Sequence, residues 1–251
     1  MDPRQQPVAV VTGGAGGIGS RICGALADAG MRVVVGYHRS ADAAQAVLAG
    51  LAGEGHVAFA APVTDSAALA ALAAEIGAHY GRCDALVNCA GITRFVPHGD
   101  LDGLDDALID RILATNVRGP FAAVRALRPL LEKSAQPGGG VVVNISSVAA
   151  TMAMGSNVMY CASKAALDNM TKSLARALAP RIRVVSVSPG LVDTAFIGSL
   201  DPAWRDQQAA RTPLGRLAAP EEIAVAVVAA IRDLTFTTGA VITVDGGRAL
   251  A

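Results

Sequence analysis

Tyr160 and Lys164 are the two residues of this sequence whose types and spacing most directly suggest proton chemistry. They are four residues apart within residues 159–178, a segment rich in Ala, Leu and Lys that we expect to be helical. Both side chains should then lie on one helix face, where the ammonium favours the phenolate and lowers the pKa of Tyr160 toward working pH. An ordinary helix with a surface lysine and a half-buried tyrosine has the same spacing, so the pair needs support from elsewhere in the chain.

Ser147 provides part of that support. Residues 141–145 form an apolar run that is typical of a buried parallel strand, so Ser147 follows the carboxyl end of a strand. In open α/β sheets, ligands bind at that edge. Its hydroxyl could donate a hydrogen bond to the same substrate oxygen that Tyr160 serves.

The amino-terminal segment has the pattern of a dinucleotide-binding turn. A short apolar strand at residues 8–12 runs into the Gly-rich residues 13–19, and residues 20–29 form an expected helix. Glycines allow the backbone to approach a pyrophosphate closely, and the helix start offers unpaired N–H groups to that anion. A Gly-rich turn without a ligand is the alternative. The candidate contacts are Gly13, Gly16, Gly17, Ile18 and Gly19.

The second expected strand, residues 32–35, bears on the choice of cofactor. In NAD-selective proteins an acid usually follows this strand and binds the ribose 2′-OH, but here no acid precedes Asp42. Arg39 and Ser40 could hold a 2′-phosphate through charge-assisted hydrogen bonds, so we favour NADP(H) over NAD(H). Alternatively, Ser40 only caps the next helix, residues 41–51, and Arg39 is solvated.

The remaining strands end in small or polar residues that should meet at the same sheet edge. Strands are expected at residues 56–61, 85–87, 183–188 and 240–244, with helices at 66–78, 104–131 and 220–231 between them. This alternation predicts one doubly wound α/β sheet in a single domain spanning residues 1–251. The candidate cofactor contacts after these strands are Val63, Asn88, Ala90, Gly91, Pro189, Gly190, Val192 and Thr194.

Two segments are expected to depart from regular structure. Pro120 has no N–H to give the carbonyl of Asn116, so we expect a break in the helical region 104–131 that frees this carbonyl for a water. Residues 196–211 show little regular pattern, and we expect a substrate lid within residues 193–215.

Composition excludes several classes of function. Equal numbers of basic and acidic residues, 21 of each, give no net charge that would favour nucleic acid or an acidic membrane surface. We find no apolar run of about 18 residues and no signal peptide, so we expect a cytoplasmic protein without a spanning helix. The four cysteines lack metal-ligand spacing, so we expect free thiols and no metal.

Taken together, these residues resemble the short-chain dehydrogenase/reductases, in the compact branch that includes the 3-oxoacyl-(acyl-carrier-protein) reductases. The resemblance covers essentially the whole chain and is carried by the order and spacing of Thr12, Gly13, Gly17, Ile18, Gly19, Asn88–Gly91, Asn116, Ser147, Tyr160, Lys164, Pro189, Gly190 and Thr194.

The resemblance implies a Rossmann-type fold with seven parallel strands. It also implies Tyr160 as the catalytic acid/base, Ser147 as the hydroxyl that polarises the carbonyl, and Lys164 as the cation that lowers the Tyr160 pKa and binds the nicotinamide ribose. Asn116 would anchor a water that passes protons to Lys164. Relatives are usually homotetramers or homodimers.

Two positions depart from the family pattern. Pro62 stands where many relatives have an Asp or Asn near the adenine, which leaves the Val63 backbone for that contact. Ala15–Gly16 stands in the turn where NADP-specific relatives often place an Arg.

Three functions remain open from the sequence. The first is NADPH-dependent reduction of a ketone or a 3-oxoacyl thioester. The second is an NAD-linked alcohol or sugar dehydrogenase, and the third is a nucleotide-binding regulatory protein without catalysis. We expect residues 93–99 and 196–211 to shape the substrate pocket, although their chemistry does not identify the substrate.

Overall fold

A single parallel sheet organises the chain. The computed structural model describes residues 6–198 and 200–250. Seven strands are ordered β3-β2-β1-β4-β5-β6-β7, and every neighbouring pair is parallel. This confirms the doubly wound sheet expected from the alternation of elements. The strands are β1 (Val8–Thr12), β2 (Arg32–Tyr37), β3 (Val57–Ala60), β4 (Ala85–Asn88), β5 (Gly140–Ile145), β6 (Ile182–Pro189) and β7 (Val241–Val244).

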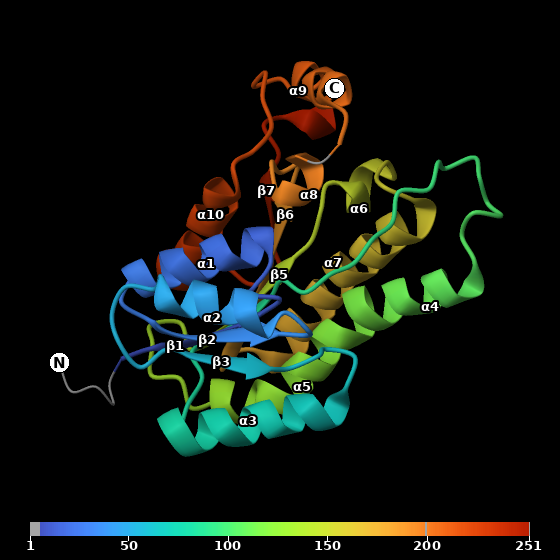
Figure 1. The fold of residues 1–251 in the computed structure, drawn as a ribbon. Coiled ribbons are helices and arrows are strands. Elements are labelled where there is room, and N and C mark those ends of the chain that lie inside the picture. The colour runs from blue at the N-terminus through green and yellow to red at the C-terminus, as the bar shows by residue number, and fades with distance from the viewer. Residues whose placement is uncertain (1–5, 199, 251) are drawn as a thin grey trace.

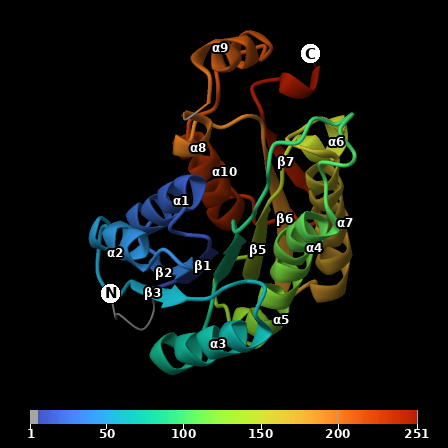
Figure 2. The same cartoon turned by 45° about the vertical axis from the view of Figure 1, so that its right-hand side comes forward.

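Helices connect the strands and cover both faces of the sheet (Figures 1 and 2). They are α1 (Gly17–Asp28), α2 (Ala41–Ala49), α3 (Ser66–Tyr80), α4 (Asp106–Leu113), α5 (Gly119–Leu131), α6 (Ala149–Met152), α7 (Val158–Leu178), α8 (Ala195–Gly198), α9 (Pro202–Ala210) and α10 (Pro220–Arg232). In Figure 1, α1 and α2 lie above the strands, and α3 and α5 lie below them.

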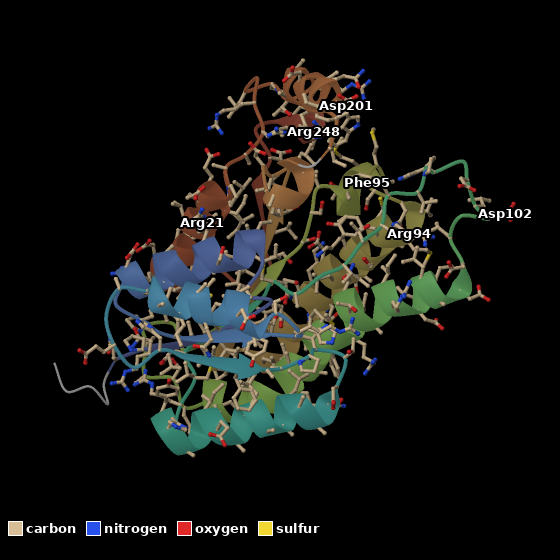
Figure 3. All side chains as sticks on the ribbon, in the orientation of Figure 1. Arg21, Arg94, Phe95, Asp102, Asp201 and Arg248 are labelled. Carbon is tan, nitrogen blue, oxygen red and sulfur yellow. The ribbon has the colours of Figure 1, made fainter. Side chains whose placement is uncertain are left out.

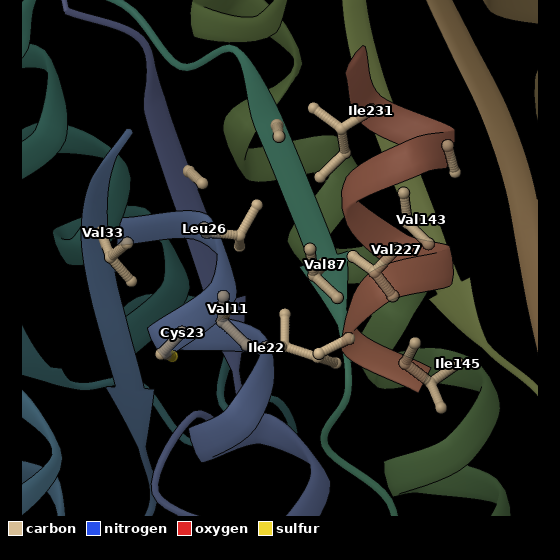
Figure 4. Close-up of a cluster of buried hydrophobic side chains, with 14 of the residues drawn as sticks. Val11, Ile22, Cys23, Leu26, Val33, Val87, Val143, Ile145, Val227 and Ile231 are labelled. Atoms are coloured by element: carbon tan, nitrogen blue, oxygen red, sulfur yellow. The ribbon is translucent and has the colours of Figure 1, made fainter. Parts of the chain in front are cut away.

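Each face of the sheet has its own hydrophobic core. On one face, α1 and α10 pack on the central strands, and α10 contributes Ile223, Val227 and Ile231 at helical spacing (Figure 4). On the other face, α3, α5 and α7 pack on the same strands. All five residues of β1 are buried because helices cover both sides, which explains why the strand is a continuous apolar run.

The chain order changes direction between β1 and β4. From β1 the chain winds outward to β2 and β3, and it then returns to build β4 to β7 on the other side. In open α/β sheets, such a switch point leaves a crevice at the carboxyl ends of the strands. The Gly-rich turn after β1, the small residues Cys89, Ala90 and Gly91 after β4, and the serines after β5 therefore lie along one crevice.

Two segments differ from the sequence expectation. Residues 196–211, expected to show little regular pattern, contain most of the helix α8 and all of α9. The break near Pro120 has the form of a π-helix, Ala114–Arg118, in which the Gly119 N–H donates to the carbonyl of Ala114. Proline thus widens the turn between α4 and α5. The binding of a water to the Asn116 carbonyl stays a prediction.

Three properties of the described residues bear on function. None of their helices is both long and apolar enough to cross a membrane. Those same residues contain no group of three or more His, Cys, Asp or Glu side chains placed to hold a metal ion. All four cysteines are free thiols, as their spacing predicts.

Candidate active site

One large cavity opens at the carboxyl edge of the sheet. Its volume is about 1370 Å³, enough for a dinucleotide and a small substrate together. Nearly all the predicted site residues line it: Gly13, Gly16, Gly17, Ile18, Gly19, Arg39, Ser40, Val63, Ala90, Gly91, Ser147, Tyr160, Lys164, Pro189, Gly190, Val192 and Thr194.

The Gly-rich turn has the shape needed to receive a pyrophosphate. Gly13 has a positive φ of +66°, and a Cβ there would lie 2.8 Å from the Cα of Ala90. A Cβ on Gly19 would lie 2.2 Å from the Gly13 carbonyl oxygen, so only glycine fits. Helix α1 begins at Gly17 and turns its unpaired N–H groups toward the cavity wall. The residues present therefore fit a dinucleotide.

Arg39 and Ser40 follow β2 and line the same cavity as the Gly-rich turn. Ser40 precedes α2, but its side chain makes no capping hydrogen bond. This argues against the alternative that Ser40 serves only as a helix cap. Within the described chain, the exposed Arg39 guanidinium has no hydrogen-bond or ion-pair partner, and it lines the cavity. Both side chains are therefore available to a ligand.

Ser147 and Tyr160 meet in the substrate part of the cavity. Ser147 follows β5, and its hydroxyl accepts a hydrogen bond from the N–H of Ala149 at 3.2 Å, which fixes its orientation. It also lies close enough to the Tyr160 phenol, which reaches the cavity from the first turn of α7, to lower the pKa of that phenol in part. Two hydroxyl groups from distant parts of the chain therefore converge on one point.

Lys164 lies one helical turn beyond Tyr160. Its Nζ is 5.7 Å from the centroid of the Tyr160 ring and donates a 2.8 Å hydrogen bond to the carbonyl of Ile145. The side chain is only 6% exposed. Burial lowers the pKa of Lys164 from 10.5 to about 8, although the nearby Cys89 and Asp168 act in the opposite direction.

The pKa of Tyr160 is raised in this structure and not lowered toward working pH, as the neighbouring Lys164 led us to expect. Burial raises the pKa of Tyr160 above its ordinary value. The hydrogen bond with Ser147 lowers the pKa in part, and the neighbouring Cys161 raises it further. Desolvation dominates because the phenolate would have to form inside a largely enclosed site.

Asn116 lies behind the cavity wall and holds two of its parts together. Its Oδ1 accepts from the N–H of Ile92 at 2.9 Å, and its Nδ2 donates to the Ile92 carbonyl and to the hydroxyl of Ser163. Ser163 precedes Lys164 on α7. The Asn116 side chain thus joins the loop after β4 to the helix that carries Tyr160 and Lys164.

Asn88, predicted to bind cofactor, does not line the cavity. Its Nδ2 donates to Asn144 Oδ1 at 2.9 Å, and Asn144 in turn donates to Thr171 at 2.8 Å. The side chain is buried and links β4 to β5 and α7. A side chain on the last residue of a strand can point into the packed layer, and its position in the sequence does not indicate which way it points.

Several cavity residues carried no distinctive sequence signal. Phe95, from the loop after β4, makes an edge contact with Trp204 of α9, with ring centroids 6.1 Å apart. Gln208, Arg211 and Arg248 line the same end of the cavity. In Figure 3, Arg248 lies beside α9, and Phe95 lies on the loop next to α6. The sequence did indicate that residues 93–99 and 196–211 shape this region, but not which side chains do so.

Comparisons with known proteins agree on the class. The family described as enoyl-(acyl carrier protein) reductase matches residues 13–249. The chain is 38% identical to cis-4-hydroxycyclohexanecarboxylate dehydrogenase of Sinomonas cyclohexanicum, covering 96% of this chain and 95% of that protein. It is 33% identical to 3-oxoacyl-(acyl-carrier-protein) reductase of Staphylococcus aureus, covering 95% and 96%. The solved structure of a glucose/ribitol dehydrogenase-type protein from Brucella melitensis superposes with a TM-score of 0.89 at 30% identity, covering 98% of this chain and 97% of that one.

Proposed function

Since the chain belongs to the short-chain dehydrogenase/reductase family and is an oxidoreductase acting on a carbonyl or its alcohol, we propose that Ser147, Tyr160 and Lys164 are its catalytic residues. One observation carries the proposal. Ser147, Tyr160 and Lys164 line one cavity together with the Gly-rich turn, the Ser147 side chain is close enough to the Tyr160 phenol to lower its pKa, and the Lys164 Nζ is 5.7 Å from the centroid of the Tyr160 ring.

Tyr160 gives its proton to the carbonyl oxygen during reduction. The nicotinamide cofactor, when bound, supplies the hydride. Ser147 donates a hydrogen bond to the same oxygen and stabilises the negative charge that develops there. The raised pKa keeps Tyr160 protonated at neutral pH, which suits an acid in the reducing direction. Lys164 stabilises the phenolate left behind and binds the ribose hydroxyls.

The test is the conservative variant Tyr160→Phe. It removes one hydroxyl and should lower kcat at least about 1000-fold, within the range that acid–base catalysis supplies, while the cofactor Kd changes less than about threefold. Turnover is followed as NADPH absorbance with ketones and 3-oxoacyl thioesters. Unchanged turnover in Tyr160→Phe would refute the assignment. Binding of NADPH without turnover of any substrate by the wild type would favour the non-catalytic alternative.

The proposed cofactor is NADP(H), with NAD(H) as the alternative. The support is the pair Arg39 and Ser40, which lines the cavity and whose side chains have no hydrogen-bond or ion-pair partner among the described residues; the first acid after β2 is Asp42, in the first turn of α2. Arg39→Ala should weaken NADPH binding about tenfold and leave NADH binding nearly unchanged, because only NADPH carries the 2′-phosphate. Equal effects on the two cofactors would contradict this preference.

An alcohol or sugar dehydrogenase is the second candidate, because relatives at similar identity include both dehydrogenases and a 3-oxoacyl reductase. The two candidates share the site and differ in direction and substrate. Measuring kcat/KM in both directions, with acetoacetyl thioesters, cyclic alcohols and alditols, separates them. Reduction of the thioester at least tenfold faster than oxidation of any alcohol supports the reductase.

Two further parts of the proposal concern the same site. Residues 193–215 act as a lid over the substrate, and a water on the Asn116 carbonyl relays protons to Lys164.

The protein forms a homotetramer or homodimer, supported by the exposed apolar Phe121, Val225 and Phe236, and sedimentation would test the assembly. Free thiols support a cytoplasmic location, which fractionation of cells would test.

A further inference from the structure

Helix α9 presents one face to the substrate end of the cavity. Trp204, Gln208 and Arg211 follow one another at intervals of four and three residues, and all three line the cavity. Trp204 makes an edge contact with Phe95 of the loop after β4, so this face of α9 and that loop meet at the wall of the cavity. Arg211 directly follows the last residue of α9, and it lines the cavity while remaining exposed to solvent.

A second arginine, Arg248, contacts this face of α9. Arg248 donates to the Gln208 carbonyl at 2.9 Å, to the hydroxyl of Thr212 at 3.2 Å, and to the Gln208 side-chain oxygen. These bonds hold Gln208, which is 6% exposed, in the wall. Arg248 is therefore fixed by its contacts, whereas the Arg211 side chain makes no hydrogen bond within the described chain; only its backbone N–H does, to the Gln207 carbonyl.

The charge of the two guanidiniums is not compensated by the described residues. None of the ion pairs in that part of the chain involves Arg211 or Arg248. Asp193, the acid nearest in sequence to α8, is paired with Arg205 at 2.6 Å, and Asp245 accepts the N–H groups of Gly247 and Ala249. Arg211 also repels Arg248 enough to lower its pKa, second to the effect of burial.

We propose that the substrate carries a carboxylate, which Arg211 binds at the α9 end of the cavity while its carbonyl or alcohol carbon faces Ser147 and Tyr160. A guanidinium matches a carboxylate through two parallel hydrogen bonds, and an uncompensated cation beside a second one gains from receiving an anion. This proposal rests on the proposed function, because the site that it deepens is the substrate end of that cavity.

Ligand binding at this end of the cavity can be measured by the fluorescence of the protein's tryptophan. Trp204 is the single tryptophan, and it lies on the same helix face as Arg211. We would titrate the protein, with and without saturating NADP⁺, with levulinate and with cyclohexanone-4-carboxylate. Each acid is paired with its methyl ester, which has the same ketone and no charge. At least one acid should bind about tenfold or more tightly than its ester, the difference expected for one charge-assisted hydrogen bond.

Two variants test whether Arg211 causes the preference for the acid over its ester. Arg211→Gln should remove the preference for the acid and change the affinity for the ester less than about twofold. Arg232→Gln is the control, because Arg232 also ends a helix, is exposed, and does not line the cavity. It should leave both affinities unchanged. The acid preference should also shrink at high salt, because Arg211 is exposed.

Three results would overturn the proposal. The first two are equal binding of every acid and its ester, and an acid preference that survives in Arg211→Gln. Binding of acetoacetyl-CoA that depends on Arg211, without any effect on the oxo acids, would also overturn it, because the arginine would then serve a phosphate. Acid-selective binding with no turnover of any ketone or alcohol would support the carboxylate site and refute the proposed catalytic function. The two failures are therefore distinguishable.

Discussion

Asn157 accepts a 2.6 Å hydrogen bond from the backbone N–H of Tyr160 and so caps the helix that carries the phenol. Its Nδ2 donates to the Arg94 carbonyl at 2.8 Å and to the hydroxyl of Thr93 at 3.2 Å. The side chain is fully buried. One amide therefore sets the position of Tyr160, the proposed catalytic acid, relative to the loop after β4 that also lines the cavity.

Asn157→Ala should destabilise the protein and slow turnover. It removes a helix cap, worth about 1 kcal/mol, and leaves buried donors and acceptors unpaired at about 1–3 kcal/mol more. Asn157→Ser keeps a capping oxygen and should recover part of the loss. Urea denaturation measures the stability, and kcat measures the displacement of Tyr160.

Asp65→Ala is the matched control for Asn157. Asp65 caps α3 through the N–H groups of Ala67 and Ala68, in an exposed position away from Tyr160. Its replacement should lower the free energy of unfolding by about 1 kcal/mol and leave kcat unchanged. Asn157 would have no role beyond capping if both variants lost the same stability and neither lost activity.

The raised pKa of Tyr160 predicts opposite pH profiles for the two directions of the reaction. Reduction needs the protonated phenol, so its kcat/KM should stay level through neutral and mildly alkaline pH and fall only above the ordinary phenol range. Oxidation needs the phenolate and should rise over the same range. Ser147→Ala removes a hydrogen bond that lowers the pKa, so both profiles of its residual activity should move to higher pH. If kcat/KM for reduction instead began to fall near neutral pH, the pKa of Tyr160 in the cofactor complex would be lowered, and this prediction would be wrong.

The buried Lys164 should make stability depend on pH. Its folded pKa is about 8 and its ordinary value is 10.5, so between these values the unfolded chain binds more protons than the folded one. The free energy of unfolding from this group therefore rises with pH across that window. Below about pH 8 the full cost of burying the charge applies, on the order of 3 kcal/mol. Above pH 10.5 the cost is absent.

Lys164→Met tests this cost directly. The variant should be inactive, yet more stable than the wild type at pH 7 by roughly 1–3 kcal/mol, because the lost bond to the Ile145 carbonyl offsets part of the gain. The difference should vanish above pH 10.5. Lys172→Met, an exposed position on the same helix, should not change the pH dependence. A less stable Lys164→Met at pH 7 would mean that the Ile145 bond outweighs the buried charge.

The features that the sequence predicted are those set by local spacing. The alternation of strands and helices, the Gly-rich turn and the four-residue interval between Tyr160 and Lys164 are each contained within a short stretch, and the structure reproduces them. The helices α8 and α9 were missed because their short segments carry weak periodicity.

Contacts between distant residues were not predictable in the same way. Asn157 forms hydrogen bonds with Arg94 and Thr93, which precede it in the sequence by 63 and 64 positions. Arg248 forms hydrogen bonds with Gln208, which lies 40 positions before it. The direction of the Tyr160 pKa depends on desolvation, which is a property of the packed site and not of the residue four positions along the helix. For the same reason, the inward orientation of Asn88 was visible only once β4 and β5 were paired.

Two glycines of α1 give the sharpest test of the nucleotide turn. A methyl group on Gly19 would lie 2.2 Å from the Gly13 carbonyl oxygen, whereas one on Gly24 would meet no heavy atom of the described chain within 4 Å. Gly19→Ala should therefore displace the turn and weaken binding of NADPH at least about tenfold, measured by its fluorescence on binding. Gly24→Ala should leave that affinity unchanged and raise the free energy of unfolding by about 0.5–1 kcal/mol, because alanine favours the helix. Since both changes add the same methyl group to the same helix, equal cofactor affinities in the two variants would show that the turn does not form the pyrophosphate site.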